Sequence, residues 1–314
     1  MKVNGLVVVP VMLAAALAPA SAQTGKLSGG ITLSGAWAIY PTAVAWGEAF
    51  STLHPKVRVD VSAGGAGKGA ADVIAGLVDI GMVSREPDPA EIARGAFPVY
   101  VLHDGVFPVV SSRNPVLDQL MRRGIPPAVW FDLYVTGKLT HWDELAGADL
   151  GGKPVHVYTR SDSCGAAATW AVFLQNRKQE DLGGIGVYGD PGILETVRRD
   201  PLGVGYANFA YVFGRDGAPV PGISVVAIDA DGDGTAGAGE ILATRKDAAR
   251  AIDEGRHPVT RRNYVFTRGK PSGLVRAFLE FVLSEEGTAV AERVGASLAL
   301  PAEERRRVLA SLAP

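Results

Sequence analysis

The chain has 314 residues, of which 47% are hydrophobic and 20% charged, as expected for a globular protein of one large or two medium domains. The formal net charge is −2, and no basic run carries interleaved aromatic residues, so the sequence gives no support to nucleic-acid binding. Cys164 is the single cysteine, so an internal disulfide is excluded and the fold depends on its core.

The first 22 residues have the pattern of a secretory signal peptide. Lys2 supplies a short positive region, residues 6–17 an apolar core, and Ala20-Ser21-Ala22 an A-x-A cleavage site. A membrane span needs roughly 20 apolar residues, so this segment is too short to be one. We therefore expect an exported, periplasmic protein whose mature chain starts at Gln23.

The mature chain alternates strand and helix patterns. Strands at residues 31–33, 57–61 and 80–83 are separated by helices at 41–53 and 70–77. This β-α-β-α-β order is typical of an α/β domain with a largely parallel sheet. Further strands are expected at 99–102, 106–110, 155–158, 204–209, 223–228 and 264–267, and further helices at 126–135, 166–174, 193–199, 248–254, 274–284 and 288–294.

The stretch HVYTRSDSCGAAATW, residues 156–170, reads as a strand, a loop of small polar residues and the start of a helix. The first amides of a helix have no partner within it, and the helix dipole places partial positive charge there, so such a loop can hold an anion. Arg160 at the loop entry can add a two-pronged charge. Alternatively, Ser163 or Asp162 only caps the helix, which is the simpler interpretation of this stretch alone.

A second glycine-rich loop, residues 65–70 (GAGKGA), follows a strand and opens a helix. It fits the dinucleotide pattern G-x-G-x-x-A, with Glu86 about 20 residues further on. A nicotinamide-dependent enzyme is not expected, because an exported protein would meet no soluble nicotinamide pool. The loop also lies in the second β-α unit of the domain and not in the first. We interpret the loop as a turn whose amides form another wall of an anion site, with Lys68 either adding charge or lying in solvent. Hydrolase signatures such as G-x-S-x-G and H-E-x-x-H are absent.

An acidic segment, DADGDGTAGAGE, fits the calcium-loop pattern D-x-D-x-D-G-x5-E at every required position. Carboxylates at positions one, three, five and twelve, with a turn glycine at six, are what Ca²⁺ binding requires. The alternative is an acidic surface turn. We expect a structural Ca²⁺ site with the ligands Asp229, Asp231, Asp233, Thr235 and Glu240.

Several segments together resemble the periplasmic phosphate-binding proteins of ABC importers, the PstS family. Their order and spacing cover nearly all of the mature chain. The segments are Ser34-Gly35-Ala36 with Tyr40-Pro41, Gly65-Ala66-Gly67-Lys68-Gly69, residues 79–85 (DIGMVSR), 137–142 (GKLTHW), 160–166 (RSDSCGA), 203–206 (GVGY) and 278–287 (FLEFVLSEEG).

The resemblance implies an α/β protein of two lobes, each a mainly parallel sheet flanked by helices, with the ligand in the interlobe cleft. Lobe one would comprise about residues 27–105 and 260–314, and lobe two 106–259. It implies a monomeric, non-enzymatic protein that captures inorganic phosphate or a related tetrahedral oxyanion and delivers it to the membrane subunits of an ABC importer. The implied ligand-binding residues are Ser34, Gly35, Ala36, Gly67, Lys68, Ser84, Arg85, Arg160, Ser163, Cys164, Gly165 and Ala166.

The ligand loops depart from the family's pattern. Cys164 stands where the family usually has Ser, Ala166 where it has Thr, and Ser84 where many members place an acceptor Asp. Hydroxyl donors are thereby lost, and the preference for a proton-carrying ligand such as hydrogen phosphate is weaker. A sensor-type binding protein for an arsenic, tungstate or molybdate oxyanion remains an alternative.

Cys164 has two interpretations. It either replaces serine as a small neutral residue whose amide faces the anion, or it is a thiol with a lowered pKa that bonds a ligand such as trivalent arsenic. We favour the first. A secreted phosphoester hydrolase with Ser163 or Cys164 as nucleophile is a further alternative, but His156, the only base implied, would lie roughly 20 Å away on an extended strand.

Overall fold

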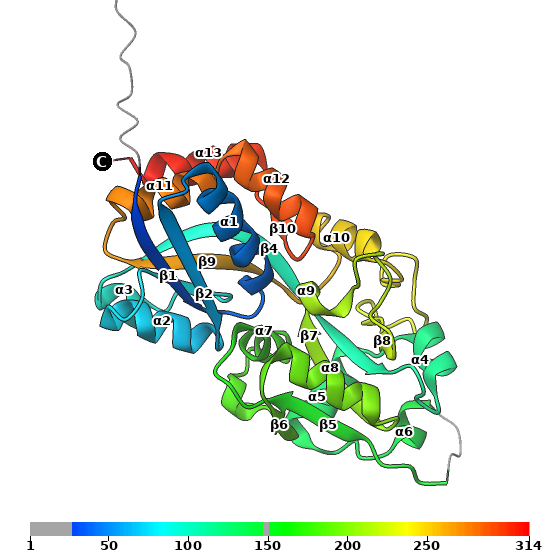
Figure 1. Cartoon of the computed structure of the whole chain (residues 1–314). Coiled ribbons are helices and arrows are strands. Elements are labelled where there is room, and N and C mark those ends of the chain that lie inside the picture. Colours follow the sequence, from blue (N-terminus) through cyan, green and yellow to red (C-terminus); the bar gives the residue numbers. More distant parts are fainter. Residues whose placement is uncertain (1–26, 147–150, 314) are drawn as a thin grey trace, which may run out of the picture.

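The computed structural model describes residues 27–146 and 151–313, so the expected signal peptide lies outside the described part. Figure 1 shows an elongated molecule with one group of elements at each end. No helix within the described ranges combines the length and apolar content of a membrane span.

A single ten-stranded sheet runs through the whole molecule in the order β2-β1-β3-β9-β4-β7-β5-β6, with β8 and β10 each pairing with β4. The neighbours of β1 and of β5 run parallel to them, whereas β9 and β4 are antiparallel to each other and to their other partners. The strands are β1 (Gly29–Gly35), β2 (Val57–Ala63), β3 (Ile80–Val83), β4 (Ala96–Ser111), β5 (His156–Arg160), β6 (Ile185–Val187), β7 (Gly203–Asn208), β8 (Ile223–Val225), β9 (Thr260–Arg268) and β10 (Leu298–Ala299).

Helices cover this sheet in both halves (Figure 1). They are α1 (Tyr40–Leu53), α2 (Ala66–Ala75), α3 (Pro89–Ala93), α4 (Leu117–Arg123), α5 (Pro127–Phe131), α6 (Trp142–Ala146), α7 (Gly165–Phe173), α8 (Gly189–Arg199), α9 (Phe209–Val212), α10 (Arg245–Asp253), α11 (Gly273–Val282), α12 (Glu285–Val294) and α13 (Ala302–Ser311), with a π-helix at Asp132–Thr136 and a 3-10 turn at Gln179–Asp181.

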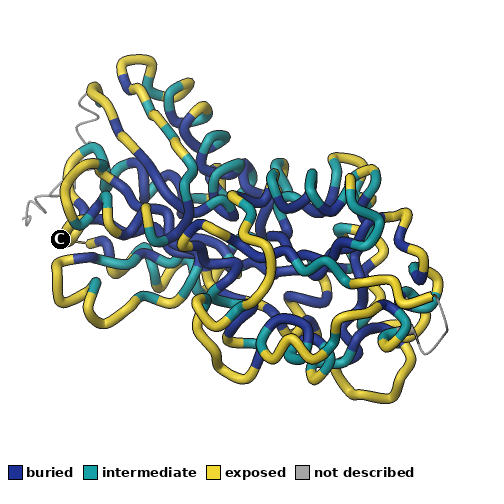
Figure 2. The backbone as a smooth tube through the Cα atoms, turned by 90° about the horizontal axis from the view of Figure 1, so that it is seen from below, coloured by how far each residue is buried: buried dark blue, intermediate teal, exposed yellow. Residues whose placement is uncertain are grey.

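The buried hydrophobic residues form three clusters, and Figure 2 shows buried segments running along the middle of the molecule. One core draws its members from residues 31–102 and 264–312, and the aromatic rings of Trp46, Phe50 and Phe278 fill its centre. Two further clusters use residues 106–259, with Trp130 and Trp170 buried in one of them. We call these two halves lobe one and lobe two.

The chain passes between the lobes in β4 and β9, which lie side by side. The sequence predicts two strands at 99–102 and 106–110, but β4 is one strand of 16 residues. The polar interruption His103-Asp104-Gly105 stays in the ladder because it pairs with residues 260–262 of β9. Asp104 lies opposite Arg261 in this register, and their side chains form a buried ion pair of 2.9 Å. At the point where polar residues interrupt the apolar sequence of β4, the strand is therefore stabilised by a buried ion pair with β9.

Other elements differ from the expectation at their ends. Helix α2 begins at Ala66 and not at residue 70, because the glycines of this loop already adopt the helix. The helix expected at 126–135 is a short α-helix followed by a π-helical turn. Helix α13 was not predicted, and its exposed, charged sequence explains why: no apolar stripe marks it.

The imidazole of His257 is buried near the crossover. Its ring stacks on Phe107 with 4.4 Å between ring centroids, and its Nε2 lies 2.9 Å from the Val106 carbonyl oxygen. Burial lowers the pKa of His257 to about 4, and the bond to the carbonyl opposes this only in part. The unfolded chain protonates this histidine near its ordinary pKa of 6.5, so the folded state is favoured above that pH.

We therefore expect the free energy of unfolding to fall by up to about 3 kcal/mol as pH drops from 6.5 towards 4, because only the unfolded chain gains this proton. His257→Gln keeps an amide donor for Val106 but cannot titrate. Urea unfolding at pH 7.5 and 4.5 should show a smaller acid loss in the variant than in the wild type. Equal losses would mean that other groups cause the acid sensitivity.

Candidate functional site

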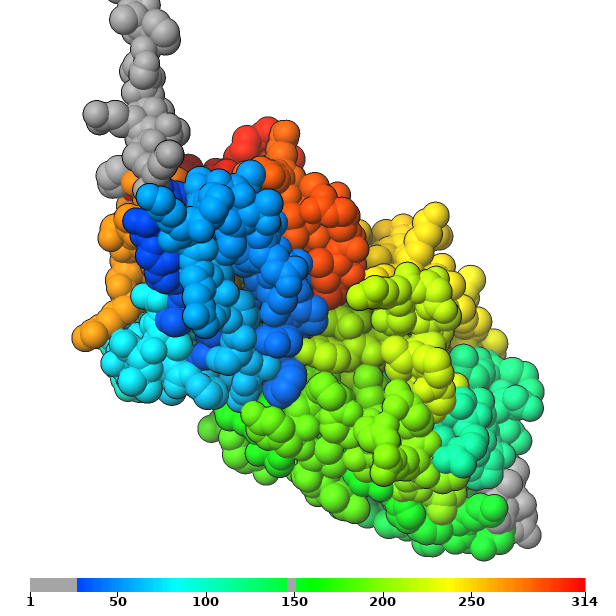
Figure 3. Space-filling model, in the orientation of Figure 1, coloured from blue at the N-terminus to red at the C-terminus, as the bar shows by residue number. Residues whose placement is uncertain are grey.

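Loops from both lobes meet at the carboxyl ends of the strands. Lobe one contributes the turn after β1, the glycine loop that opens α2 and Ser84 after β3; lobe two contributes residues 160–165 between β5 and α7. The Gly67 amide donates to the Ser163 carbonyl oxygen across the interface at 3.0 Å. Figure 3 shows the blue part of lobe one lying against the green part of lobe two. The Arg160 loop and the glycine loop 65–70, both predicted to line an anion site, are thus in contact across the interface.

Two glycines allow this close approach. A Cβ on Gly165 would lie 2.0 Å from the Ser84 carbonyl oxygen and 2.3 Å from its Oγ. A Cβ on Gly67 would lie 2.3 Å from the Ser163 Oγ. A side chain at Gly165 would therefore meet the backbone of the other lobe and hold the lobes apart, whereas one at Gly67 would first displace the Ser163 side chain.

Arg160 is fully buried below these loops, with 0% of its side chain exposed. Its Nε and Nη2 donate to the two oxygens of Asp162 at 2.8 and 2.7 Å, and its Nη1 donates to Asp190 Oδ2 at 2.8 Å. Asp162 also accepts from the Gly189 amide, at 3.2 Å. One guanidinium is thus held by two carboxylates, which the sequence did not predict.

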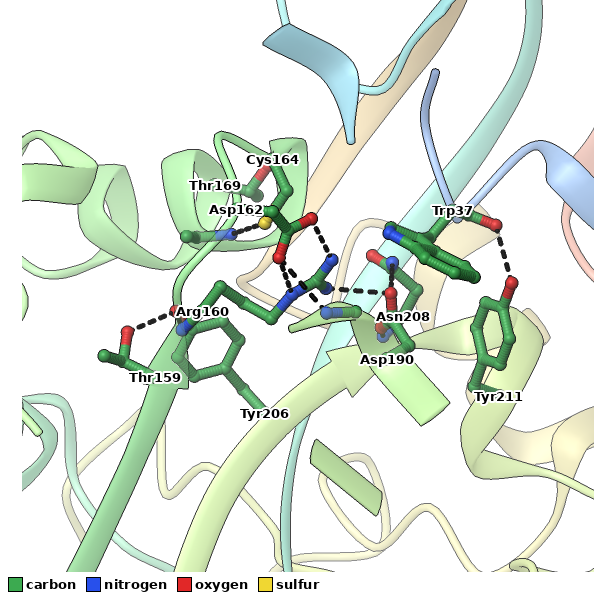
Figure 4. A network of polar contacts seen from close by, with 12 residues as sticks. Trp37, Thr159, Arg160, Asp162, Cys164, Thr169, Asp190, Tyr206, Asn208 and Tyr211 are labelled. Atoms are coloured by element: carbon green, nitrogen blue, oxygen red, sulfur yellow. Dashed lines mark hydrogen bonds and ion pairs between the residues drawn. The ribbon is translucent and has the colours of Figure 1, made fainter. Parts of the chain in front are cut away.

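Figure 4 shows Arg160 with Asp162, Asp190 and Asn208, and from Asn208 the network continues to the crossover strands. Asp190 accepts from the amide and the side-chain nitrogen of Asn208, both at 2.8 Å, and the Asn208 side-chain oxygen accepts from Arg261 Nη2. Arg261 also bonds Asp104 of β4 and, at 3.4 Å, the Thr169 hydroxyl of α7. A continuous chain of buried polar groups therefore joins the Arg160 loop to the strands between the lobes.

Three predicted ligand residues use their side chains within lobe one. Ser34 Oγ donates to Asp72 Oδ2 at 2.6 Å, and Lys68 Nζ pairs with the same carboxylate. Arg85 forms a two-pronged pair with Glu91 at 2.6 and 2.9 Å. Lys68 and Arg85 thus each have a carboxylate partner within lobe one, and their role as ligand-binding residues stays a prediction.

The first ligand loop is also held within lobe one. The Ala36 amide donates to the Met82 carbonyl oxygen at 2.9 Å, and the Gly35 carbonyl oxygen accepts from the amides of Gly64 and Gly65. Gly35 has φ +129°, and a Cβ there would meet the Met82 carbonyl oxygen at 2.3 Å. The Ala36 amide is therefore already bonded within lobe one, and the Gly35 carbonyl oxygen holds the glycine loop in place.

Cys164 is the N-cap of α7, and its sulfur accepts from the Ala167 amide at 3.5 Å. Its own amide donates to Gln179 Oε1 at 3.0 Å and so does not face an anion, contrary to expectation. Burial raises the pKa of the thiol to about 11, although Arg160 opposes this. The interpretation of Cys164 as a reactive thiol with a lowered pKa is therefore wrong. The amides of Gly165 and Ala166 remain without an acceptor among the described residues.

The acidic segment 229–240 forms a compact loop. Oxygens of Asp229, Asp231 and Asp233 lie within 4.8 Å of one another. Asp229 is buried, and its two oxygens accept from the amides of Gly232 and Gly234. The twelfth position differs from the prediction: Glu240 accepts from the amides of Ala230 and Gly237, at 2.6 and 3.0 Å, and is not part of the three-carboxylate group. Thr235 donates its amide to Asp233 Oδ1, at 2.7 Å.

Comparisons with known proteins identify the family of this chain. A family model described as a PBP superfamily domain matches residues 20–286. The phosphate-binding protein PstS of Bacillus subtilis is 26% identical over 267 residues, which cover 83% of this chain and 77% of the relative. PstS 2 of Streptococcus agalactiae serotype V is 31% identical over 128 residues, which cover 40% of this chain and 41% of the relative.

Two solved structures are also similar. A phosphate ABC transporter substrate-binding protein of Clostridium perfringens, solved with bound phosphate, is 25% identical with a TM-score of 0.70 and covers 87% of this chain and 100% of that chain. An ABC-type phosphate transport receptor of Vibrio cholerae is 18% identical with a TM-score of 0.64 and the same coverage, which shows a shared fold. The chain therefore belongs to the PBP superfamily, and the resemblance to PstS proteins seen in its sequence is confirmed.

Proposed function

We propose that this protein is an exported solute-binding protein that captures phosphate or a related tetrahedral oxyanion and delivers it to an ABC importer. One observation carries the proposal: loops of both lobes meet over the buried Arg160 guanidinium, at the N-termini of α2 and α7. The similarity to phosphate-binding PstS proteins over most of the chain supports this choice of ligand.

The donors for such an anion come mainly from lobe two. A guanidinium has five N–H groups, and the carboxylates of Asp162 and Asp190 use three of those of Arg160. Two hydrogens on Nη1 and Nη2 remain, together with the amides of Gly165 and Ala166 at the positive end of α7. These donors lie on one loop, as a small oxyanion requires.

The carboxylates of the site favour a ligand that carries a proton. Asp162 Oδ2 lies 3.0 Å from the point where a Cβ on Gly65 would be, so this oxygen faces the loop of lobe one. A carboxylate repels an oxyanion without a proton and accepts a hydrogen bond from one that has it. Asp162 can therefore supply the carboxylate acceptor that is missing at Ser84, and we expect phosphate and arsenate to bind more tightly than sulfate.

Calorimetry with phosphate, arsenate, sulfate, molybdate and tungstate tests the proposal. Micromolar or tighter binding of phosphate or arsenate is the expected result. A preference for molybdate or tungstate would support the sensor-type alternative, and no binding of any of the five anions would contradict the proposal. Loss of phosphate uptake in cells that lack the protein would support its role in transport.

The hydrolase alternative has little support. Neither Cys164 Sγ nor Ser163 Oγ has a hydrogen bond to a basic side chain in the described part of the chain. His156 instead pairs with Asp200, with 2.6 Å between Nδ1 and Oδ2. A nucleophile needs a base within hydrogen-bond reach, so the protein is proposed to be a binding protein only.

We also propose that the loop 229–240 binds a structural Ca²⁺ through Asp229, Asp231 and Asp233, whose oxygens are grouped as such an ion requires. Calcium should raise the melting temperature of the wild type, because an ion that binds only the folded state stabilises it. Asp233→Asn keeps the acceptor for the Thr235 amide but removes the charge. This variant should match the wild type in chelator and show a smaller gain in calcium.

Asp216→Asn is the matched control, since Asp216 is also exposed and accepts from an amide two residues on, at 3.1 Å. It should respond to calcium as the wild type does. A wild-type melting temperature that is the same in calcium and in chelator would exclude the ion.

A further inference from the structure

Trp37 of lobe one lies in the contact with lobe two. It follows β1, and its ring lies edge-on to Tyr188 and Tyr211 of lobe two, with 5.9 and 6.4 Å between ring centroids. Its carbonyl oxygen accepts from the Tyr211 hydroxyl at 3.1 Å. The position of this ring is therefore set by both lobes together.

The indole lies directly beside the Arg160 network. A Cβ on Gly189 would be 3.0 Å from Trp37 Cζ2 and 3.5 Å from its Nε1, and Gly189 donates its amide to Asp162. Gly189 also has φ +71°, so glycine is required there for both reasons. In Figure 4 the indole nitrogen is on the side of the ring that faces Arg160 and Asp162.

The Nε1–H of Trp37 is buried and has no acceptor among the described residues. Buried indole donors normally find a partner, and an unpaired one destabilises the fold. Trp46 and Trp142 follow this rule, because they donate to the carbonyl oxygens of Gly287 and Leu202. Trp130 and Trp170 also lack an acceptor, but they belong to the apolar core of lobe two and not to the contact between the lobes.

We propose that the Trp37 Nε1–H is a ligand-binding donor of the interlobe site and donates to the oxyanion held there; this inference rests on the proposed function. Two carboxylates already neutralise Arg160, so neutral donors must supply much of the recognition of the anion. An indole N–H only donates, and therefore recognises an oxygen of the ligand that carries no proton. Asp162 recognises the protonated oxygen, so the pair fits a tetrahedral oxyanion with both kinds of oxygen, such as hydrogen phosphate.

Trp37→Phe tests the assignment because it removes the donor and keeps an aromatic ring between the tyrosines. Phosphate affinity, measured by calorimetry, should fall by about tenfold or more, as expected for the loss of a hydrogen bond to a charged group. The melting temperature without phosphate should stay equal or rise, because an unpaired buried donor is removed. Trp46→Phe is the control: it leaves the Gly287 carbonyl oxygen unpaired, so it should lower the melting temperature and leave phosphate affinity unchanged.

A second measurement uses the wild type and does not depend on how the variant folds. With ¹⁵N-labelled tryptophan, phosphate should shift one indole N–H resonance strongly downfield, as a new hydrogen bond does, and the other four should move little. If wild-type protein binds phosphate but Trp37→Phe binds it as tightly, or if no indole resonance shifts, the donor assignment is wrong and the proposed function stands. If the wild type binds no oxyanion, both are wrong.

Discussion

Arg160→Ala is expected to lower the free energy of unfolding by about 3–5 kcal/mol, because it leaves buried carboxylates without their cation. Asp162 and Asp190 have 4% and 0% of their side chains exposed, and neither can turn to water. Denaturant unfolding measures the loss directly, and any affinity measured on this variant must be corrected for the unfolded fraction.

A second substitution separates charge from packing in this prediction. Asp190→Asn in the Arg160→Ala background removes one of the unpaired charges, so the double variant should be more stable than Arg160→Ala alone. Arg58→Ala is the control, because its pair with Asp60 is exposed and should contribute less than about 1 kcal/mol. A loss no larger for Arg160→Ala than for Arg58→Ala would mean that Arg160 is not a buried cation.

Gly165→Ala is expected to weaken oxyanion binding by at least about tenfold while each lobe stays folded, because it disfavours the approach of the lobes on which binding depends. The three nearest atoms to a Cβ at this position all belong to Ser84 of the other lobe, the closest at 2.0 Å. Alanine is also a good residue for the first turn of a helix, so α7 itself is not harmed. Calorimetry gives the affinity, and small-angle scattering with phosphate present should show a larger radius of gyration than for the wild type.

The matched control for this variant is Gly30→Ala. Gly30 lies in β1 of lobe one, and a Cβ there has no atom within 4 Å. The phosphate affinity and the radius of gyration of Gly30→Ala should equal those of the wild type. If Gly165→Ala binds phosphate as tightly as Gly30→Ala does, the contact with Ser84 plays no part in ligand capture.

The sequence predicts the scaffold of the site well and its electrostatics poorly. Loops such as 65–70 and 160–166 are local: strand, small residues and helix start are adjacent in the chain, so pattern and resemblance suffice. The partners of Arg160 are not local. Asp190 opens α8 and Asn208 ends β7, and only the strand order brings both beside β5.

The Lys68–Asp72 ion pair could have been predicted from the sequence. Lys68 and Asp72 are four residues apart on a helix, the spacing at which opposite charges pair, so Lys68 already had a candidate partner. Trp37 left no such signal. Its tyrosine neighbours 188 and 211 lie far along the chain in the other lobe, and no periodicity links them to the turn after β1.

The shared sheet of the two lobes has a mechanical consequence. Among the described residues, β4 and β9 are the strands that cross between the lobes, and they are bonded to each other up to the pair Gly105–Thr260, next to the Asp104–Arg261 ion pair. A two-stranded ribbon bends and twists readily but resists sliding, because sliding would break every ladder bond at once. Relative motion of the lobes is therefore a rotation about one flexible ribbon. Such a rotation would separate the loops at Ser84 and Gly165 when the lobes open, and would bring the same residues back into contact when the lobes close.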